Sequence, residues 1–437
     1  MKKRVYELIK HPLFSGSMVM IIGSNVISFL NYLYHLIMVR LLAPPSYGEL
    51  VALFSLIGFL GILSSSLNLV VTKFVSAAKN NLEISSIVSW LNSKIFIFSL
   101  AVFLLITFLS PIISSFLKIE NNLLIILIAL PSLLGLASLL YKSVLQGLLR
   151  FQQMILSVFV ENGLKLILGV ILVYAGFSVG GAVAGLVIAS FIGFFLSRFF
   201  IRNFLKASEE KPNIKSMFLY SFPVTVQYLS ITSLFSSDIL LIKHFFSPHD
   251  AGIYAIISTL GKIILFGTGP IGAVMFPLVS QRQARGDNYK RIFFLSFILT
   301  FTLAVLILLI YWFIPEQVIN LLNPSYLEAA PLLVWYGIFI TFFTLSSLFI
   351  SYYLSLNRVS VVILPFIAAV AQIIGIWFFH RSLFEVILVS SIVAGMLLVL
   401  LLIYSAYGSK LGVGDSAGIQ TRKNNSQRFK EDEGSFR

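Results

Sequence analysis

The chain has 437 residues, of which 58% are hydrophobic and 11% charged, and its mean hydropathy is +0.97. Soluble domains are about 45–50% apolar and about 25% charged, so a soluble fold has too little interior for this much apolar surface. The composition therefore indicates an integral membrane protein. Cysteine is absent, which excludes disulfides, thiolate metal sites and cysteine nucleophiles.

Long apolar runs along the chain predict twelve transmembrane helices. A helix needs roughly 20 apolar residues to cross about 30 Å of hydrocarbon, whereas membrane strands are about ten residues long with alternating polarity. The first run is too long for a cleavable signal peptide and lacks a small-residue cleavage site. The predicted spans are 14–39, 47–71, 92–117, 122–149, 153–175, 179–200, 217–242, 251–276, 292–314, 328–354, 359–379 and 383–407.

The net charge of +14 is concentrated on one predicted side of the membrane. If both termini are cytoplasmic, 24 of the 31 Lys and Arg lie inside. Four lie outside (Arg40, Lys118, Lys243 and Arg381) and three within spans (Lys142, Lys165 and Lys262). Because cytoplasmic loops are enriched in Lys and Arg, this split predicts a multi-pass protein of the inner or plasma membrane with both termini in the cytoplasm. The basic charge thus indicates orientation and attraction to anionic lipid, and not nucleic-acid binding.

The predicted spans divide into two sets of six around a polar connection at 201–216. The expected organisation is an N-terminal lobe at 1–200, a cytoplasmic linker at 201–216 and a C-terminal lobe at 217–407. Residues 408–437 have the polar composition of a disordered cytoplasmic tail. Two sets of six spans enter the membrane in the same direction, which allows a parallel internal repeat.

Sequence matches at one offset support this repeat. Arg40, Pro44 and Gly48 after the first span correspond to His244, Pro248 and Gly252 after the seventh, an offset of 204 residues. At the same offset, Val75-Ser76 corresponds to Val279-Ser280. Proline ends one helix and glycine allows the next to pack closely, so both halves are predicted to make a tight outer turn here.

Four segments carry a resemblance to a known family. They are Arg40-Leu-Leu-Ala-Pro-Pro-Ser-Tyr-Gly-Glu-Leu, Phe246-Ser-Pro-His-Asp-Ala-Gly-Ile-Tyr254, Met275-Phe-Pro-Leu-Val-Ser280 and Asn323-Pro-Ser-Tyr-Leu-Glu-Ala-Ala330. In order and spacing they resemble the polysaccharide transporter family, the O-antigen-flippase-like branch (lipopolysaccharide and oligosaccharide flippases) of the multidrug/oligosaccharidyl-lipid/polysaccharide exporter superfamily. The resemblance implies an all-α protein of two six-helix lobes around a central cavity, which flips lipid-linked sugars by alternating access. It also implies glycosyltransferases and a polymerase of the same pathway as partners.

Charged residues within the spans are the main site candidates, because a charge at the bilayer centre costs about 2.5–3.5 kcal/mol. Lys262 lies near the middle of its span with no acid within a turn, so we expect it in the substrate cavity, with Asp238 as the nearest acid available to it. Glu161 and Lys165 are four residues apart on one helix face. They form either a self-neutralising pair or part of the cavity wall.

Other polar groups in the spans have weaker signals. Asp238 and Glu161 are possible ion-coupling groups, and Asp238 could equally lie in the outer vestibule. Asn25 and Gln227 occupy equivalent helices and could face the central axis, although hydrogen bonding between helices is the commoner role of such residues. Lys142 is close enough to the inner end for its side chain to extend to lipid head groups.

Enzyme and cofactor signatures are absent from the sequence. It contains no phosphate-binding loop and no serine nucleophile elbow, and its five histidines lack metal-ligand spacing. A membrane glycosyltransferase or polymerase would need a large outer loop carrying acids, and the predicted outer loops are short. We therefore expect no enzyme activity, no cofactor and no metal, with the glycosyltransferase kept as a remote alternative.

The resemblance and the charges predict one cargo above others. A lysine in the membrane suits a phosphate group, so the expected function is to flip a polyprenyl-pyrophosphate-linked oligosaccharide from the cytoplasmic to the outer leaflet. A cation-coupled multidrug exporter of the same superfamily is an alternative, since Asp238 and Glu161 could serve it. A flippase for the peptidoglycan precursor is another.

Overall fold

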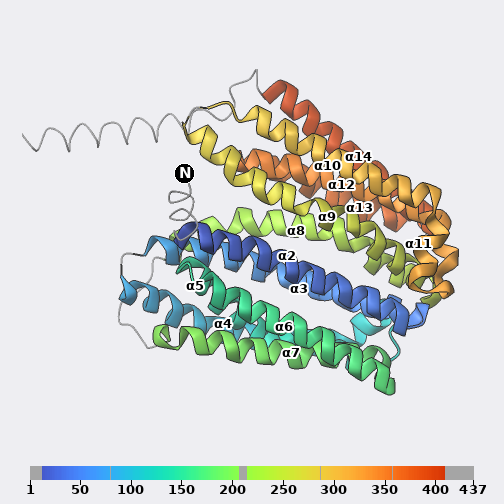
Figure 1. The fold of residues 1–437 in the computed structure, drawn as a ribbon. Helices are drawn as coiled ribbons and strands as arrows, with labels where there is room; N and C mark the ends of the chain where they lie inside the picture. The colour runs from blue at the N-terminus through green and yellow to red at the C-terminus, as the bar shows by residue number, and fades with distance from the viewer. Residues whose placement is uncertain (1–11, 79, 206–213, 286, 357, 409–437) are drawn as a thin grey trace, which may run out of the picture.

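The computed structural model describes residues 12–78, 80–205, 214–285, 287–356 and 358–408. Within these residues the fold consists of helices and their connections, without strands, and the long helices run side by side (Figure 1). The predicted tail and much of the predicted 201–216 linker lie outside the described residues.

The chain forms two successive sets of helices. The first comprises α2 (Pro12–Leu41), α3 (Pro44–Ala77), α4 (Asn81–Phe116), α5 (Asn122–Gly147), α6 (Phe151–Leu172), the π turn η1 (Val173–Phe177), α7 (Ser178–Ile201) and the 3₁₀ turn η2 (Arg202–Phe204). The second comprises α8 (Ile214–Phe245), α9 (Pro248–Arg285), α10 (Lys290–Phe313), α11 (Pro315–Leu322), η3 (Pro324–Ala329), α12 (Ala330–Ser355), η4 (Val359–Val362), α13 (Ile363–Phe378) and α14 (Leu383–Gly408).

The predicted transmembrane helices are all present in the described chain. Eleven segments are long and apolar enough to cross a membrane, and one of them, Phe151–Phe204, contains both α6 and α7. The chain bends between these two helices at Gly176, whose φ of +95° lies in the region that favours glycine. Twelve long helices therefore account for the twelve predicted spans.

Several helices extend beyond their predicted spans. The apolar run at 92–117 belongs to α4, which begins at Asn81, where the Asn80 side chain accepts a hydrogen bond of 2.7 Å from the Glu83 amide. Likewise α9 continues to Arg285, past the predicted end at 276. Hydropathy locates the part of a helix that lies in hydrocarbon, whereas capping and backbone hydrogen bonding set where the helix itself ends.

The two halves repeat the same packing. In the first half α2 packs on α6, α3 on α5, α4 on α5, α5 on α7, and α6 on α7. The equivalent pairs in the second half, α8 with α13, α9 with α12, α10 with α12, α12 with α14 and α13 with α14, also pack together. Contacts between the halves come mainly from α3 with α8 and α9 (Figure 1). The prediction of two related six-helix lobes is confirmed.

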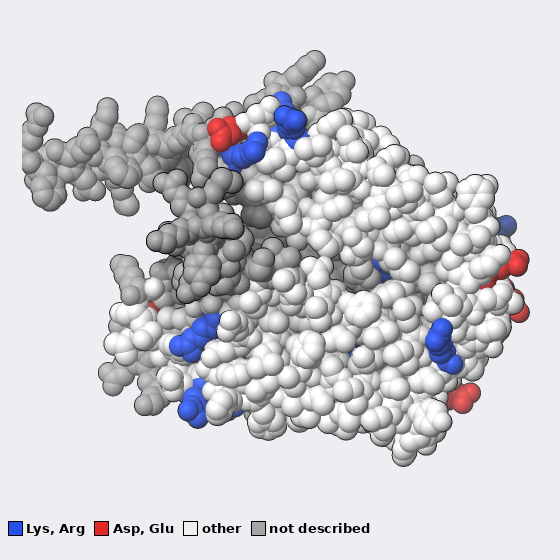
Figure 2. Space-filling model, in the orientation of Figure 1, with Lys and Arg blue, Asp and Glu red and all other residues white. Residues whose placement is uncertain are grey.

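Charged side chains gather at the two ends of the helix bundle (Figure 2). We call the end where α2 begins and α14 finishes the terminal end, and the opposite end, which carries α11, the distal end. In this view Lys and Arg dominate the terminal end, whereas most of the visible Asp and Glu lie at the distal end. The wide belt between them is almost uncharged, as expected of a surface that contacts lipid.

We expect the terminal end to be cytoplasmic. Reporter tags fused before residue 1 and after residue 437 should both be protected in intact cells, because twelve spans return the chain to its starting side. A tag inserted beside Glu120, at the distal end, is the control and should be accessible from outside. A C-terminal tag that is accessible in intact cells would contradict the even number of spans.

Candidate functional site

A cavity of about 440 Å³ lies between the two halves, and we call it the central cavity. It is lined by four helices, two from each half, and its wall alternates hydroxyl, amide and aromatic groups. The lining residues are Ser28, Asn31, Tyr32 and His35 of α2, Val51, Phe54, Ser55 and Gly58 of α3, Thr232, Phe235 and Ser236 of α8, and Thr259, Lys262 and Phe266 of α9.

The lining follows the internal repeat. Ser28, Asn31 and Tyr32 of α2 are 204 residues before Thr232, Phe235 and Ser236 of α8, which is the offset of the sequence repeat. Ser55 and Gly58 of α3 are related in the same way to Thr259 and Lys262 of α9. The cavity therefore lies on the axis that relates the halves. Lysine stands in one half where glycine stands in the other, which gives the site a charge on one side and space on the other.

Lys262 is the charged side chain among the described residues that line the central cavity. Its ammonium lies 3.8 Å from the centroid of the Phe235 ring, an arrangement that stabilises a cation through the ring's quadrupole. The predicted position of Lys262 in a cavity agrees with this geometry.

The central cavity is closed on its distal side by direct packing of the two halves. A Cβ added to Gly48 would lie 2.6 Å from the Gly252 backbone nitrogen, and one added to Gly252 would overlap the Pro44 carbonyl. These glycines are the pair that the sequence repeat predicts at the two tight turns. Beneath them the Tyr47 hydroxyl lies 2.7 Å from the Thr259 hydroxyl and bridges α3 and α9.

Five side chains hold the distal ends of the halves together, and each bonds a backbone carbonyl of the other half. We call them the distal latch. The bonds run from Arg40 to Leu321 (2.7 Å), Asn323 to Val39 (3.1 Å), Tyr326 to Leu42 (3.0 Å), Lys118 to Phe245 and Phe246 (3.3 and 3.2 Å) and His244 to Phe116 (2.8 Å). Every acceptor lies at or just beyond the C-terminal end of a helix, where carbonyls lack intrahelical partners. The distal latch therefore supplies hydrogen bonds to helix-end carbonyls that would otherwise need water as a partner.

The terminal side of the same helices is open by comparison. All residues of α9 from Ala251 to Gly261 are buried, whereas Phe266 and Val274 further along are exposed. Exposed apolar side chains also line the terminal parts of α2 and α8, including Phe29 and Phe222. The structure thus has a cavity closed at the distal end, which is an inward-facing state if the terminal end is cytoplasmic.

Lys165 does not form the predicted contact with Glu161. Its ammonium donates to the Asn31 side-chain oxygen and lies 5.0 and 5.9 Å from the ring centroids of Tyr34 and Phe54. The reason is that this side of α6 packs on α2, so the lysine side chain reaches a neighbouring helix before it reaches the next turn of its own. Lys165 is buried behind the cavity wall and orients Asn31, which lines the cavity.

Glu161 pairs with Lys142 of α5, and not with Lys165. Both residues line a separate pocket of about 280 Å³ inside the first half. Lys142 is therefore not extended toward lipid head groups as predicted, because the carboxylate on α6 holds its ammonium inside the lobe. Glu161 lies in this pocket and not on the wall of the central cavity.

The pair of Lys142 and Glu161 is expected to stabilise the first lobe. Glu161→Gln or Lys142→Met alone should lower the thermal unfolding midpoint, because each leaves the other charge in a poorly solvated pocket. The double variant should recover most of the loss, with a coupling of about 0.5–3 kcal/mol in a double-mutant cycle. Additive effects in the double variant would show that the two groups do not interact.

Asp238 is fully buried and does not lie on the cavity wall. Its carboxylate accepts hydrogen bonds from the Ile239 amide (2.9 Å) and from the hydroxyls of Tyr254 (2.8 Å) and Tyr336 (3.2 Å). Within the described residues it forms no ion pair within 4.0 Å, so Asp238 and Lys262 are not in direct contact. The geometry joins α8, α9 and α12 into one hydrogen-bonded network.

Asn25 and Gln227 lie on the terminal sides of α2 and α8, beyond the residues that line the central cavity. The sequence analysis missed two other residues of the cavity wall, Tyr32 and His35. The Tyr32 hydroxyl and the His35 Nδ1 are buried without a hydrogen-bond partner in the described structure. A signal for them was present. Ser28, Asn31, Tyr32 and His35 recur at helical spacing within an apolar span, which places polar groups on one face.

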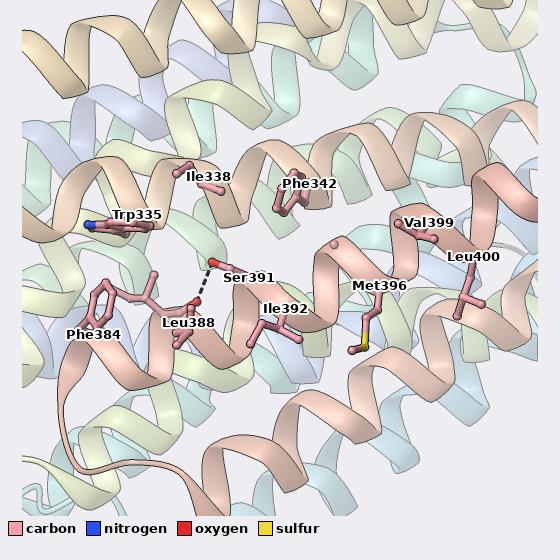
Figure 3. Close-up of a pocket in the computed structure, with 12 residues that line it drawn as sticks. Trp335, Ile338, Phe342, Phe384, Leu388, Ser391, Ile392, Met396, Val399 and Leu400 are labelled. Atoms are coloured by element: carbon pink, nitrogen blue, oxygen red, sulfur yellow. Dashed lines mark hydrogen bonds between the residues drawn. The ribbon is translucent and has the colours of Figure 1, made fainter.

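A larger groove of about 630 Å³ lies between α12 and α14 on the outside of the second half (Figure 3). Its wall is formed by apolar side chains such as Trp335, Phe342, Phe384 and Met396, and the Ser391 hydroxyl is bonded to the Ile387 carbonyl at 2.8 Å. This groove offers no charged group to a polar cargo. The central cavity is therefore the candidate site.

Solved structures that share this fold include a multidrug transporter and a lipid flippase. An inward-facing multidrug resistance MATE family transporter of the MOP superfamily superposes with a TM-score of 0.72 at 14% identity, covering 92% of this chain and 100% of that one. The lipid II flippase MurJ in an inward closed conformation gives 0.70 at 15% identity, covering 88% and 87%. An outward-facing MATE transporter of the same superfamily gives 0.58 at 16% identity, covering 93% and 98%. No curated protein matches the sequence.

The fold is that of the MATE and MurJ membrane proteins. The sequence matches the family described as "Polysaccharide biosynthesis protein" over residues 14–283, more than half of its length. The chain belongs to this family.

Proposed function

We propose that the protein flips a polyprenyl-pyrophosphate-linked oligosaccharide from the cytoplasmic to the outer leaflet of the cell membrane. The observation that carries the proposal is Lys262, the lysine among the described residues that line the central cavity, whose other lining groups are mainly hydroxyl, amide and aromatic. An ammonium binds phosphate as a point charge. Hydroxyl and amide groups on the cavity wall, such as those of Ser28, Asn31 and Thr232, suit the sugars.

The surroundings of the cavity suit an amphiphile. Exposed apolar side chains on the terminal parts of α2 and α8, such as Val26 and Leu229, allow the lipid tail to remain in hydrocarbon while the head group enters. The head group would enter from the terminal end, because the distal latch closes the other end. Release would require the latch to open, and substrate or a coupling ion must bind the two states with different affinity.

A cation-coupled drug exporter is the second candidate, supported by the fold shared with MATE transporters. Such an exporter would favour acids on the cavity wall, and among the described lining residues the charged one is a lysine. Asp238 is instead buried where α8, α9 and α12 pack together, and its carboxylate accepts three hydrogen bonds there. We therefore keep Asp238 as a candidate coupling group and not as a substrate contact.

Competition binding tests the cargo class. Purified protein in nanodiscs is titrated with a fluorescent polyprenyl-pyrophosphate disaccharide, then with the same glycolipid lacking the pyrophosphate and with a cationic drug. We expect the pyrophosphate to improve binding about tenfold or more, since bonds to charged groups contribute about 1.5–3 kcal/mol. Equal binding of the uncharged glycolipid, or displacement by the cationic drug at lower concentration, would contradict the proposal.

A further inference from the structure

Two arginines form a second basic site far from the central cavity, at the terminal end of α7. Arg198 and Arg202 are one turn apart and line a surface pocket of about 480 Å³ with Phe195, Phe199 and Leu205. The pocket lies on the outside of the first half, where α7 passes into η2. It shares no lining residue with the central cavity or with the pocket around Glu161.

Both guanidinium groups are held in place by neighbouring side chains. Arg198 donates to the Tyr141 hydroxyl at 3.2 Å, and Tyr141, which is buried, donates to the Asn92 side chain at 2.6 Å. Arg202 lies 4.8 Å from the centroid of the Phe199 ring. Among the residues that the structure describes, neither arginine has a carboxylate within 4.0 Å. The site therefore presents two oriented guanidinium groups, whose planar donors suit phosphate oxygens.

The rest of the pocket suits hydrocarbon. Phe195 and Phe199 are 62% and 57% exposed. Phe195 precedes both arginines, on the side of α7 toward the membrane centre, and Phe199 lies between them in the chain. Large exposed aromatic rings on a membrane helix face lipid tails. An occupant that satisfies the whole pocket has an anionic phosphate head beside the arginines and an apolar chain over the rings.

We propose that this pocket is a binding site for an anionic phospholipid of the leaflet at the terminal end. The phosphate lies between Arg198 and Arg202, and one acyl chain packs on Phe195 and Phe199. Zwitterionic phospholipids carry a phosphate but no net charge, so two guanidinium groups attract them less strongly. The site is independent of the transported cargo, and its failure would leave the role of Lys262 untouched.

Thermal unfolding in detergent, with phosphatidylglycerol, phosphatidylcholine or inorganic phosphate added, tests the proposal. A ligand that binds the folded state raises the unfolding midpoint. We expect phosphatidylglycerol to raise the midpoint most, and Arg198→Gln/Arg202→Gln to remove that extra shift. Loss of each arginine should weaken phosphatidylglycerol binding about tenfold. If the double variant does not fold, Arg202→Gln alone serves instead, because it leaves the Arg198–Tyr141 bond in place. It should lose part of the extra shift that phosphatidylglycerol gives.

The matched control is Lys290→Gln/Arg291→Gln, which removes two positive charges from the start of α10 in the other half. This variant should keep the full phosphatidylglycerol response. An unchanged response in the α7 variants, or an equal loss in the control, would overturn the site. An equal response to inorganic phosphate would overturn its assignment to a lipid.

Discussion

Lys262→Ala is expected to lower flipping of a polyprenyl-pyrophosphate-linked oligosaccharide by about 10- to 100-fold, while expression and membrane insertion stay normal. The variant removes the lysine ammonium from the cavity wall, and a charge-assisted bond to phosphate contributes about 1.5–3 kcal/mol. Removing a cation from the membrane also favours insertion, so no insertion defect is expected. The measurement is the initial flipping rate in proteoliposomes.

Two controls separate charge from packing at this position. Lys262→Arg keeps the charge and should retain much of the activity, whereas Lys262→Met fills similar space and should be as inactive as Lys262→Ala. Lys290→Ala removes an exposed lysine at the start of α10 and should flip normally. A fully active Lys262→Ala variant would remove this lysine from the mechanism.

Gly252→Leu is expected to shift the protein toward a conformation in which the distal ends of the halves are apart. A side chain there would overlap the Pro44 carbonyl, so the closed distal end cannot form without displacement of the backbone. Overpacking of this kind costs about 1–3 kcal/mol, which corresponds to roughly a 5- to 150-fold change in the ratio of two states. Gly48→Leu should act in the same direction, because it meets Gly252 across the same contact.

Spin-label distances can report this shift, because the chain has no cysteine of its own. Cysteines introduced at Glu120 and Glu316 report the distal end, and cysteines at Ser76 and Gln281 report the terminal end. The distal distance should lengthen in Gly252→Leu and the terminal distance should shorten. Gly163→Leu is the control, since a Cβ there meets nothing within 4 Å. Unchanged distances in Gly252→Leu would contradict alternating access by movement of the halves.

The fold was largely predictable from the sequence because hydropathy and the internal repeat are strong one-dimensional signals. The spans followed from the length of the apolar runs, and the offset of 204 residues correctly paired Gly48 with Gly252, which meet in the structure. The same offset also relates Gly58 to Lys262 across the cavity. Position along a helix was sufficient to identify Gly48, Gly252 and Lys262, whereas the structure added Gly58.

Side-chain partners were less predictable, because they depend on the rotation of each helix about its axis. Glu161 and Lys165 share a helix, yet each bonds a residue of another helix, Lys142 and Asn31. The distal latch could not be predicted at all. Its side chains bond backbone carbonyls, which carry no sequence signal, and the bonds join segments far apart in the chain.

The most direct test of the account is flipping by the purified protein alone in proteoliposomes. A fluorescent polyprenyl-pyrophosphate oligosaccharide is placed in both leaflets, and a glycosidase added outside reports how fast the inner pool becomes accessible, with and without an imposed ion gradient. We predict that the protein makes the inner pool accessible, that Lys262→Ala does so about 10- to 100-fold more slowly, and that a cationic drug is not accumulated. Access no faster than in protein-free vesicles under either condition, together with gradient-driven accumulation of the drug, would contradict the proposed function.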